Sequence, residues 1–583
     1  MKANHLHRIF KSILCACVMT VCASSCVYID DHLGENFIPT NQQYDVYTMA
    51  FPLKNISMAY ADSLSGFSST RFTVGSIRDP ETGGLTSRSS AFTLVPLNEE
   101  MDFGEDPQVI QFHFTAVKDT VSCIAEDEER ILQNIRVYEV KKDLGSKYIY
   151  TSSGYRMEDD GIIGDTEISA PIIYNGGDSL SFDFKKEFSQ TFIETLAQKF
   201  ADIEDIDGYN EAFPGIYITA DEPAGNGGRI NMFGLALGVN DSYYVTSNYA
   251  ELKFSALFEG ESERRDTSYL FYFGAQDLTY SSSTAQYALN VCRQDGYDKT
   301  TPGNNILQAT EKIIVQGGGG LKPVISAQEI RDSLHTYFEK NGTDYMNVVI
   351  NKASLIMPFD DPKYETKGIY PAMLSPTCRL RSEVTSDEDE EETENSVYYA
   401  GLTDASVSSE NQGNVNWSLS QYAPDITHHV QEIIKLGDDA DFSTRDIWLL
   451  IMATETITET SDNSSMNEYM QNLLYNSYYN NLYGYGYGNY GYGYGGYYDY
   501  NNYYNYYMMA AMMSNASQPT TSSSTQLDKD RFYVCTLRGP EATTLPDGVT
   551  QSDIDNALSR ADALMLQGVP MMKVTYSVPK RGE

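Results

Sequence analysis

Several segments of the chain alternate apolar and polar residues, and this period of two constrains the fold more than any other feature of the sequence. Ile110, Phe112 and Phe114 are separated by polar residues, and the segment 252–258 follows the same rule. Successive side chains of a strand point to opposite faces, so each segment predicts a strand with one buried face. We expect Ile110 on that face together with Phe112 and Phe114. The same reasoning predicts strands at 135–140, 215–219, 348–357, 447–453, 532–537 and 573–578.

Two segments have the period of a helix instead. Phe188, Phe192 and Leu196 recur every fourth residue, which predicts a helix with one apolar stripe. A second helix is predicted at 425–436, where Gly437 follows as a C-terminal cap. Each half of the chain therefore contains strands, one helix and then further strands.

The chain has 583 residues, of which 41% are hydrophobic, and this is enough for more than one domain with a full core. We predict a mostly β protein with two tandem β-sandwich (jelly-roll-like) domains, at 48–300 and 301–583, each with one amphipathic helix. The shared order of elements has two explanations. One is duplication, and the other is the loose similarity of any two β-rich halves.

The first 25 residues have the pattern of a secretory signal. Basic residues at positions 2, 8 and 11 precede an apolar run that ends in small residues before Cys26. A cysteine at the cleavage point is typical of a lipoprotein signal, so we predict a signal peptide at 1–25 and acylation, for example by palmitate, at Cys26. A membrane-spanning helix is the alternative, but the run is shorter than the roughly 20 residues it requires. Residues 26–47 are predicted to tether the first domain to the lipid.

Two segments of the second half are predicted to be insertions. Residues 386–394 are almost all acidic and are expected to form a solvated loop. Residues 475–507 consist mainly of Tyr, Gly and Asn, a composition that does not specify a packed core. The second insertion is either an adaptable contact surface or a drifting segment with no specific partner.

Motifs for catalysis or metal binding are missing from the sequence. The glycines 317–320 lack the Lys-Ser/Thr pair of a phosphate loop and predict a tight turn. His428 and His429 are neighbours on the predicted helix, so they point about 100° apart and cannot share one ion, and His429 is expected to border the core. The acidic run 202–207 before Gly208 has the residue types of a calcium loop but not its spacing. We expect no catalytic residue, no cofactor and no metal site.

The formal net charge is −40. This charge repels nucleic acid and anionic lipid, so the membrane link is expected to come from the lipid anchor. The cysteines after the signal are far apart, and we expect buried thiols, although a disulfide is compatible with the sequence. They are Cys123, Cys292, Cys378 and Cys535.

A series of short motifs resembles a known family in its order along the chain. They are 31–34 (DHLG), 38–39 (IP), 44–47 (YDVY), 74–80 (VGSIRDP), 83–84 (GG), 214–218 (PGIYI), 315–318 (VQGG), 349–353 (VINKA) and 573–576 (KVTY). Over nearly its whole mature length, the chain resembles Bacteroidota surface lipoproteins of domain-of-unknown-function family 4270. The resemblance implies a mostly β protein anchored in the outer membrane and facing the cell exterior, and it supplies no catalytic residues. Asp30 and Asp31, just behind Cys26, resemble the surface-export signal of such lipoproteins.

These features favour a non-enzymatic, surface-exposed lipoprotein of the outer membrane. Its expected role is a binding or scaffold subunit of an outer-membrane protein assembly, secretion or uptake complex, with an outer-membrane β-barrel protein as partner. The alternative is a cell-surface carbohydrate-binding lipoprotein, because β-sandwiches rich in tyrosine present rings on which sugars stack. A hydrolase is the third class, and it would need a pair of carboxylates that one sequence cannot reveal. The ligand-binding residues are unknown from sequence.

Overall fold

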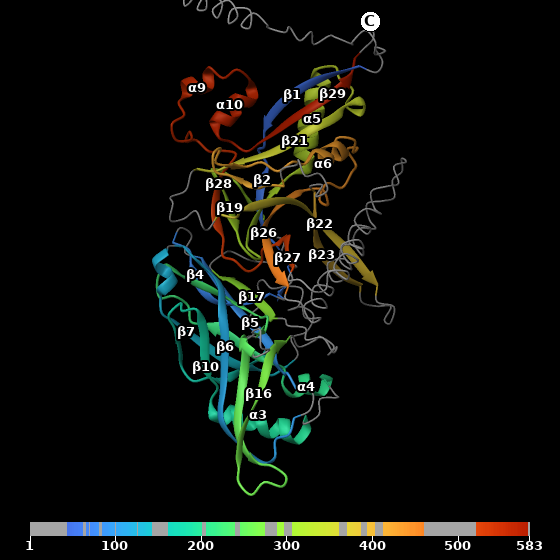
Figure 1. The fold of residues 1–583 in the computed structure, drawn as a ribbon. Coiled ribbons are helices and arrows are strands. Elements are labelled where there is room, and N and C mark those ends of the chain that lie inside the picture. The colour runs from blue at the N-terminus through green and yellow to red at the C-terminus, as the bar shows by residue number, and fades with distance from the viewer. Residues whose placement is uncertain are drawn as a thin grey trace, which may run out of the picture.

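The computed structural model describes residues 43–580 with gaps at 62–63, 65, 69, 81–83, 99–100, 125, 143–160, 201–205, 240–244, 275–287, 296–305, 361–369, 386–392, 403–411 and 460–519. Antiparallel sheets dominate this part of the chain, which confirms a mostly β, sandwich-like architecture. The described residues form two structural units, each built around its own large hydrophobic core (Figure 1). We call residues 66–295 the inserted unit, and residues 44–61 together with 306–580 the split unit.

A closed ring of six antiparallel strands forms the centre of the inserted unit. Strands β5 and β16 pair along Thr93–Pro96 and complete the ring, so that the long strands β5 and β6 belong to both layers of the sandwich. In ring order the strands are β4 (Arg71–Arg78), β5 (Leu85–Pro96), β16 (Arg265–Gly274), β15 (Tyr249–Leu257), β6 (Glu105–Cys123) and β12 (Gly227–Gly234).

Phenylalanine rings fill the inside of this ring of strands. Phe72 lies 5.1 Å from Phe233 between ring centroids, and Phe92 lies 5.0 Å from Phe273. Five of the six strands contribute alternate residues to the interior, as the period of two predicts, and β12 contributes Phe233. Large aromatic side chains suit this place because each removes much apolar surface from water.

The prediction for Ile110 is wrong, because strand β6 contains a bulge. Lys253 pairs with Gln111, but the next residue, Phe254, pairs with Val109. The extra residue Ile110 is therefore turned outward and is 55% exposed, and Val109 takes the buried position.

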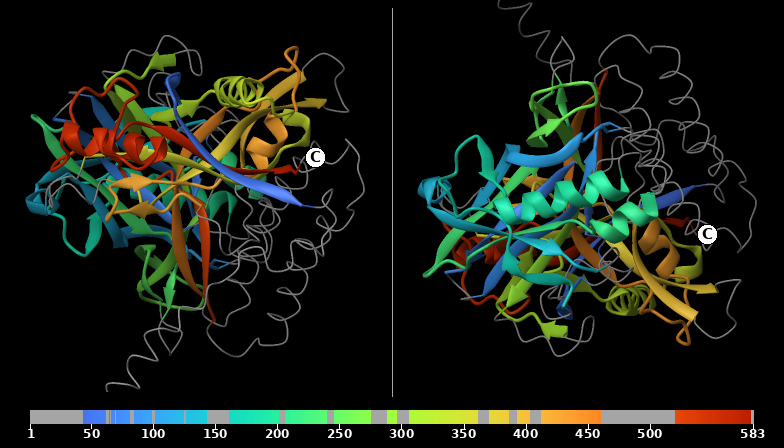
Figure 2. Two further views of the ribbon diagram at one scale, coloured as in Figure 1. Left: turned by 90° about the horizontal axis from the view of Figure 1, so that it is seen from above. Right: turned by 90° about the horizontal axis from the view of Figure 1, so that it is seen from below.

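The predicted helix of the first half is confirmed as α3 (Lys186–Lys199), which lies across one end of the inserted unit (Figure 2, right). Its stripe packs on the phenylalanine core, where Phe192 lies 5.2 Å from Phe112. The other elements of this unit are β3 (Phe67–Ser68), η3 (Glu126–Arg130), β7 (Gln133–Val140), β8 (Ile163–Glu167), β9 (Ile172–Tyr174), β10 (Ser179–Asp183), α4 (Ile206–Ala212), β11 (Ile216–Ala220), β13 (Gly238–Val239), β14 (Val245–Ser247) and β17 (Ala288–Asp295).

The split unit contains two larger sheets, and the first two strands of the described residues belong to them. Strand β1 (Tyr44–Pro52) pairs with β29 (Met571–Pro579), and β2 (Ile56–Tyr60) pairs with β20 (Leu321–Ile325). The remaining strands are β18 (Ile306–Gln308), β19 (Lys312–Gln316), β21 (Val349–Pro358), β22 (Met373–Thr385), β23 (Thr393–Gly401), β24 (Val415–Asn416), β25 (Gln421–Tyr422), β26 (Ile447–Glu459), β27 (Thr520–Leu527) and β28 (Val534–Arg538).

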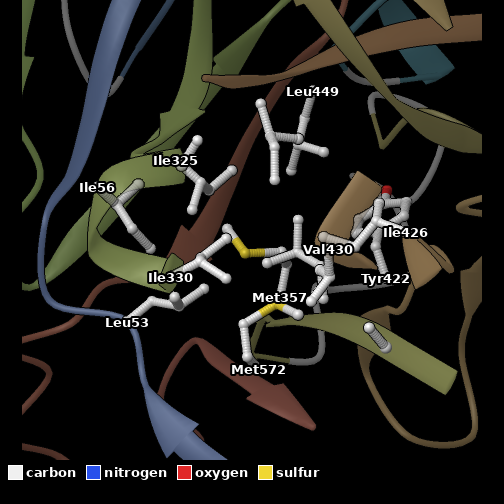
Figure 3. Packing of buried hydrophobic residues seen from close by; sticks show 14 of the residues in the cluster. Leu53, Ile56, Ile325, Ile330, Met357, Tyr422, Ile426, Val430, Leu449 and Met572 are labelled. Carbon is white, nitrogen blue, oxygen red and sulfur yellow. The ribbon is translucent and has the colours of Figure 1, made fainter. Parts of the chain in front are cut away.

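This pairing differs from the predicted division at 48–300 and 301–583. The segment 48–60 contributes six side chains to the core of the split unit, and among them Ile56 points toward Ile330, Val430 and Met572 (Figure 3). The inserted unit therefore lies between two segments of the split unit. The two units also have different strand orders, so the similar order of elements in the sequence is not a repeated topology.

The predicted helix of the second half is confirmed as α6 (Thr427–Ile433), with shorter bounds than 425–436, but the predicted cap Gly437 is wrong because the C-cap is Ile434. The structure adds a longer helix, α5 (Ala327–Lys340), whose first turn is capped by Ser326. A helical turn η4 (Tyr345–Asn347) and two short helices, α9 (Gln551–Asp555) and α10 (Arg560–Gln567), complete the split unit. The insertion 475–507 and residues 386–392 of the acidic run lie outside the described residues, and 393–394 begin β23.

Candidate functional site

The predicted lipidation site Cys26 and the predicted export signal, Asp30 and Asp31, lie outside the described residues. The predicted tether, however, is shorter than 26–47. Residues Tyr44–Tyr47 are already part of β1, where they pair with β29. Strand β1 therefore starts within about 20 residues of the predicted lipid.

The sheet that contains β1 has an outer face, opposite the core, that the described residues cover at one end only. There, Ala50, Ile356 and Met571 pack against Ala561 and Leu564 of helix α10. Figure 1 shows α9 and α10 beside β1 at this end. The short helices thus bury the half of the face that is more distant from the predicted tether.

The other half of this outer face is exposed on β1 and β21, whereas Ser577 of β29 between them is 7% exposed. Val46, Ser577 and Val349 form one row across β1, β29 and β21. The side chains of Val46 and Val349 are 63% and 46% exposed, and Tyr44, nearest the tether, is 54% exposed. We call this half the open face, which consists of Tyr44, Val46, Thr48, Val349, Lys352 and Thr575.

Strand β1 is also the edge of its sheet. It pairs with β29 on one side, and no described strand pairs with its other side. Edge strands present backbone donors and acceptors to which a further strand can bind. The open face and this edge meet along the first residues of β1, next to the predicted tether.

A second candidate site is a hollow of about 180 Å³ on the outer surface of the inserted unit. It lies over β5, between the neighbouring strands β11 and β17. The central strand contributes the small side chains Ser87 and Ser89 between larger side chains of both neighbours, and this difference in size produces the hollow. We call it the polar hollow, and its lining is Ser87, Ser89, Tyr217, Thr219, Ala220, Asp221, Glu222, Val291 and Arg293.

Hydroxyl groups form the floor of the polar hollow. The Ser89 hydroxyl donates a hydrogen bond to Thr219 Oγ1 at 2.8 Å. The Ser87 hydroxyl is shielded from solvent and has no hydrogen-bond partner among the described residues. Tyr217 and Val291 belong to a small apolar cluster beside this floor, so one wall of the hollow is apolar.

Ion pairs close the other end of the polar hollow. Arg293 Nη2 lies 2.7 Å from Glu222 Oε1, and Arg78 Nη2 lies 3.6 Å from Glu222 Oε2. Arg136 donates to both carboxylate oxygens of Asp221, and this hydrogen bonding lowers the pKa of Asp221. Each carboxylate of the lining is therefore held by arginine.

The glycines 317–320 form the predicted tight turn, between β19 and β20. Lys322 is buried beneath it, and its ammonium group donates to the carbonyl oxygens of Gln316, Gly318 and Gly320. The turn packs against the inserted unit, because a side chain added at Gly318 would meet Arg88 and Cys292. This cluster joins the two units and serves the fold.

The two histidines of α6 have different surroundings, as predicted. His429 is buried, and its Nε2 donates to the carbonyl oxygen of Arg445 at 2.9 Å. Burial lowers the pKa of His429 to about 4, so the ring is neutral at pH 7. His428 is exposed and lies 3.2 Å from Glu432. His429 therefore borders the core.

Other buried titratable groups also have structural partners. Asp446 accepts a hydrogen bond from the backbone N–H of Ala327 at the start of α5, and burial raises its pKa to about 6. Burial raises the pKa of the Cys123 thiol to about 11 and that of Cys378 to about 12, which makes both poor nucleophiles. The four described cysteines are free thiols, and all but Cys123 are buried.

Within the described ranges, no three His, Cys, Asp or Glu side chains are grouped so that they could hold a metal ion. The acidic run considered as a calcium loop lies mostly outside these ranges, and its last members, Asp207 and Gly208, lie in α4. The described helices also include none that is long and apolar enough to cross a membrane.

Comparison with known proteins found no relative of this chain. No protein-family model matches the chain, and no curated protein or solved structure is similar to it.

Sequence reasoning identified neither candidate site. The polar hollow combines β5, β11 and β17, which are far apart in the sequence and come together only through strand pairing. The sequence did contain a pattern that could have indicated strand β1, because Tyr44, Val46 and Thr48 alternate with Asp45 and Tyr47. That signal lay within the segment predicted to be a tether.

Proposed function

We propose that this protein is a non-enzymatic lipoprotein of the outer membrane, anchored through Cys26 and facing the cell exterior. In this proposal it acts as a binding or scaffold subunit of an assembly, secretion or uptake complex. The observation that supports the proposal best is the position of the open face, which begins where the predicted tether ends. The resemblance to surface lipoproteins points to the same location.

The tether limits where a partner can be. About 17 residues separate Cys26 from Gln43, and a fully extended chain of this length spans at most about 60 Å. A flexible chain of the same length has a root-mean-square span of roughly 20 to 25 Å. The open face is therefore held close to the membrane surface, where the outer parts of a β-barrel protein are within reach.

The composition of the open face suits a protein partner better than a lipid surface. Valine, tyrosine and threonine side chains form a mixed apolar and polar surface of the kind found at protein interfaces. Lys352 is a single basic residue within it, which is too few for electrostatic binding to anionic headgroups. The free edge of β1 adds backbone groups that a strand of the partner can use.

The test is affinity capture of the tagged full-length lipoprotein from its native outer membrane after mild solubilisation. We expect a β-barrel protein in stoichiometric amount with the wild-type chain. The double substitution Val46→Glu and Val349→Glu places two charges on the open face, and we expect it to reduce this capture at least about tenfold.

The matched control is Ile173→Glu, which changes an equally exposed aliphatic residue of the inserted unit. We expect this variant to capture the partner as the wild type does. If the wild type is recovered alone, the scaffold proposal is wrong. If the double variant captures the partner normally, the partner binds elsewhere and the open face is not the docking surface.

A further inference from the structure

The polar hollow has the properties of a ligand site that is independent of the open face. It lies in the inserted unit, whereas the open face belongs to the split unit. Its floor includes the Ser87 hydroxyl, which is shielded from solvent and has no hydrogen-bond partner among the described residues. A shielded polar group without a partner costs free energy unless a water molecule or a ligand bonds to it.

The volume of the hollow limits the size of its ligand. At about 180 Å³ it holds about six water molecules at the ~30 Å³ that each occupies in the liquid. Pockets for drug-sized ligands are larger, at roughly 300 Å³ or more. The occupant is therefore a single small polar molecule or one terminal residue of a longer chain.

The lining determines the chemistry of that occupant. Ser87, Ser89 and Thr219 provide hydroxyl groups that both donate and accept, and the carboxylate of Glu222 accepts. Tyr217 and Val291 supply the apolar wall. A sugar ring carries hydroxyl groups on its rim and C–H groups on its faces. Its rim matches the hydroxyl and carboxylate groups of the lining, and its faces match the apolar wall.

The charges argue against an anionic ligand. The arginines at the closed end, Arg78, Arg136 and Arg293, are already within ion-pair distance of Asp221 or Glu222. The chain as a whole has a net charge of −40, which repels anions. We propose that the polar hollow binds one neutral hexose unit, with Glu222 hydrogen-bonding to its hydroxyl groups and the Ser87 hydroxyl turning into the hollow to bond to another.

The test uses the full-length protein in a detergent without a sugar headgroup, because a maltoside detergent would compete. The probes are D-glucose, D-galactose, D-mannose and N-acetyl-D-glucosamine, measured by saturation-transfer NMR and calorimetry, with D-glucuronate as an anionic comparison. We expect at least one neutral sugar to bind with a dissociation constant near or below about 1 mM, as a single small site of this kind allows.

Two substitutions test the residues in the hollow. Glu222→Gln keeps the shape of a half-exposed side chain but removes its charge, and Ser87→Val removes the shielded hydroxyl. We expect each to weaken sugar binding at least about tenfold. The matched controls on other surfaces are Glu251→Gln, whose carboxylate lies 3.2 Å from Lys253, and Ser181→Ala on β10. We expect both controls to bind as the wild type does.

Several results would overturn the proposal. They are no binding of any neutral sugar at about 20 mM, tighter binding of glucuronate than of the neutral sugars, or unchanged binding in both Glu222→Gln and Ser87→Val. Near-UV circular dichroism checks folding, and Glu222→Gln alone decides the matter if Ser87→Val does not fold. Capture of a β-barrel partner through the open face is a separate readout, so either proposal can fail without the other.

Discussion

The ammonium group of Lys322 donates a hydrogen bond to the carbonyl oxygen of Gly318 at 2.8 Å, and the lysine is 1% exposed. The same group also bonds to the carbonyl oxygen of Gly320 at 3.0 Å. A lysine is rarely this buried, and here the charge is compensated by backbone carbonyls of the glycine turn. Because that turn packs against Arg88 of the inserted unit, Lys322 supports the joint between the two units.

Replacing Lys322 should therefore destabilise the protein. Lys322→Met keeps the length of the side chain but leaves buried carbonyl groups without their donor, and we expect a loss of roughly 2 to 4 kcal/mol in the free energy of unfolding. Urea unfolding measures this loss. The control Lys312→Met changes an exposed lysine of β19 and should stay within about 0.5 kcal/mol of the wild type. A loss below about 1 kcal/mol for Lys322→Met would show that water replaces the ammonium group.

The position of β1 predicts which unit responds to a change near the N-terminus. Phe51→Ala removes a buried side chain from the core of the split unit, at a cost of about 3 to 5 kcal/mol. We expect faster amide hydrogen exchange in β21 and β29, with β6 and β12 unchanged. Phe233→Ala, in the core of the inserted unit, should produce the opposite pattern. Faster exchange in β6 and β12 alone after Phe51→Ala would contradict the assignment of β1 to the split unit.

His429 predicts a loss of stability at mildly acidic pH. Its pKa falls from the ordinary 6.5 to about 4 on folding, so the unfolded chain binds more protons between these values. The contribution of neutral His429 to the free energy of unfolding is therefore fully present above about pH 6.5. It declines as the pH falls toward 4, and at pH 5 it is smaller by about 2 kcal/mol. Asp446 acts in the opposite direction, because its pKa is raised to about 6 on folding, and it offsets part of this loss.

The variant His429→Gln isolates the histidine contribution, because glutamine can donate to the Arg445 carbonyl without titrating. Between pH 7 and pH 5, the wild type should lose about 2 kcal/mol more than this variant in urea unfolding. The neighbouring variant His428→Gln changes an exposed ring and should depart from the wild-type dependence on pH by less than His429→Gln does. An identical dependence on pH in the wild type and His429→Gln would refute a neutral, buried His429.

The predicted export signal is tested by substitution of its two aspartates. Changing Asp30 and Asp31 together to alanine should leave the acylation of Cys26 intact, measured by incorporation of labelled palmitate. The variant should then be protected from protease added to whole cells, whereas the wild type is digested. Cys26→Ala is the control that loses acylation itself. Unchanged digestion of the double variant would show that these two aspartates do not direct surface display.

Local patterns in the sequence were sufficient to place many of the individual elements. The strands around Phe112, Phe254 and Val574 and the helix around Leu196 lie where their periods predicted them. Helix α5 was missed, although Ile330, Leu334 and Phe338 have the same spacing of four residues. The error at Ile110 has a different cause, since a bulge depends on the partner strand and leaves no trace in the alternation of one segment.

The sequence by itself determined the mostly β character, because a side-chain period of two or four is a property of neighbouring residues. Only the tertiary structure decided which strands pair. Thr48 of β1 lies opposite Thr575 of β29, and β5 meets β16 to close the ring around the phenylalanines. The polar hollow over Ser87 and the open face around Val46 follow from that pairing. Strand partners are selected by the burial of the whole chain, and no local period contains that information.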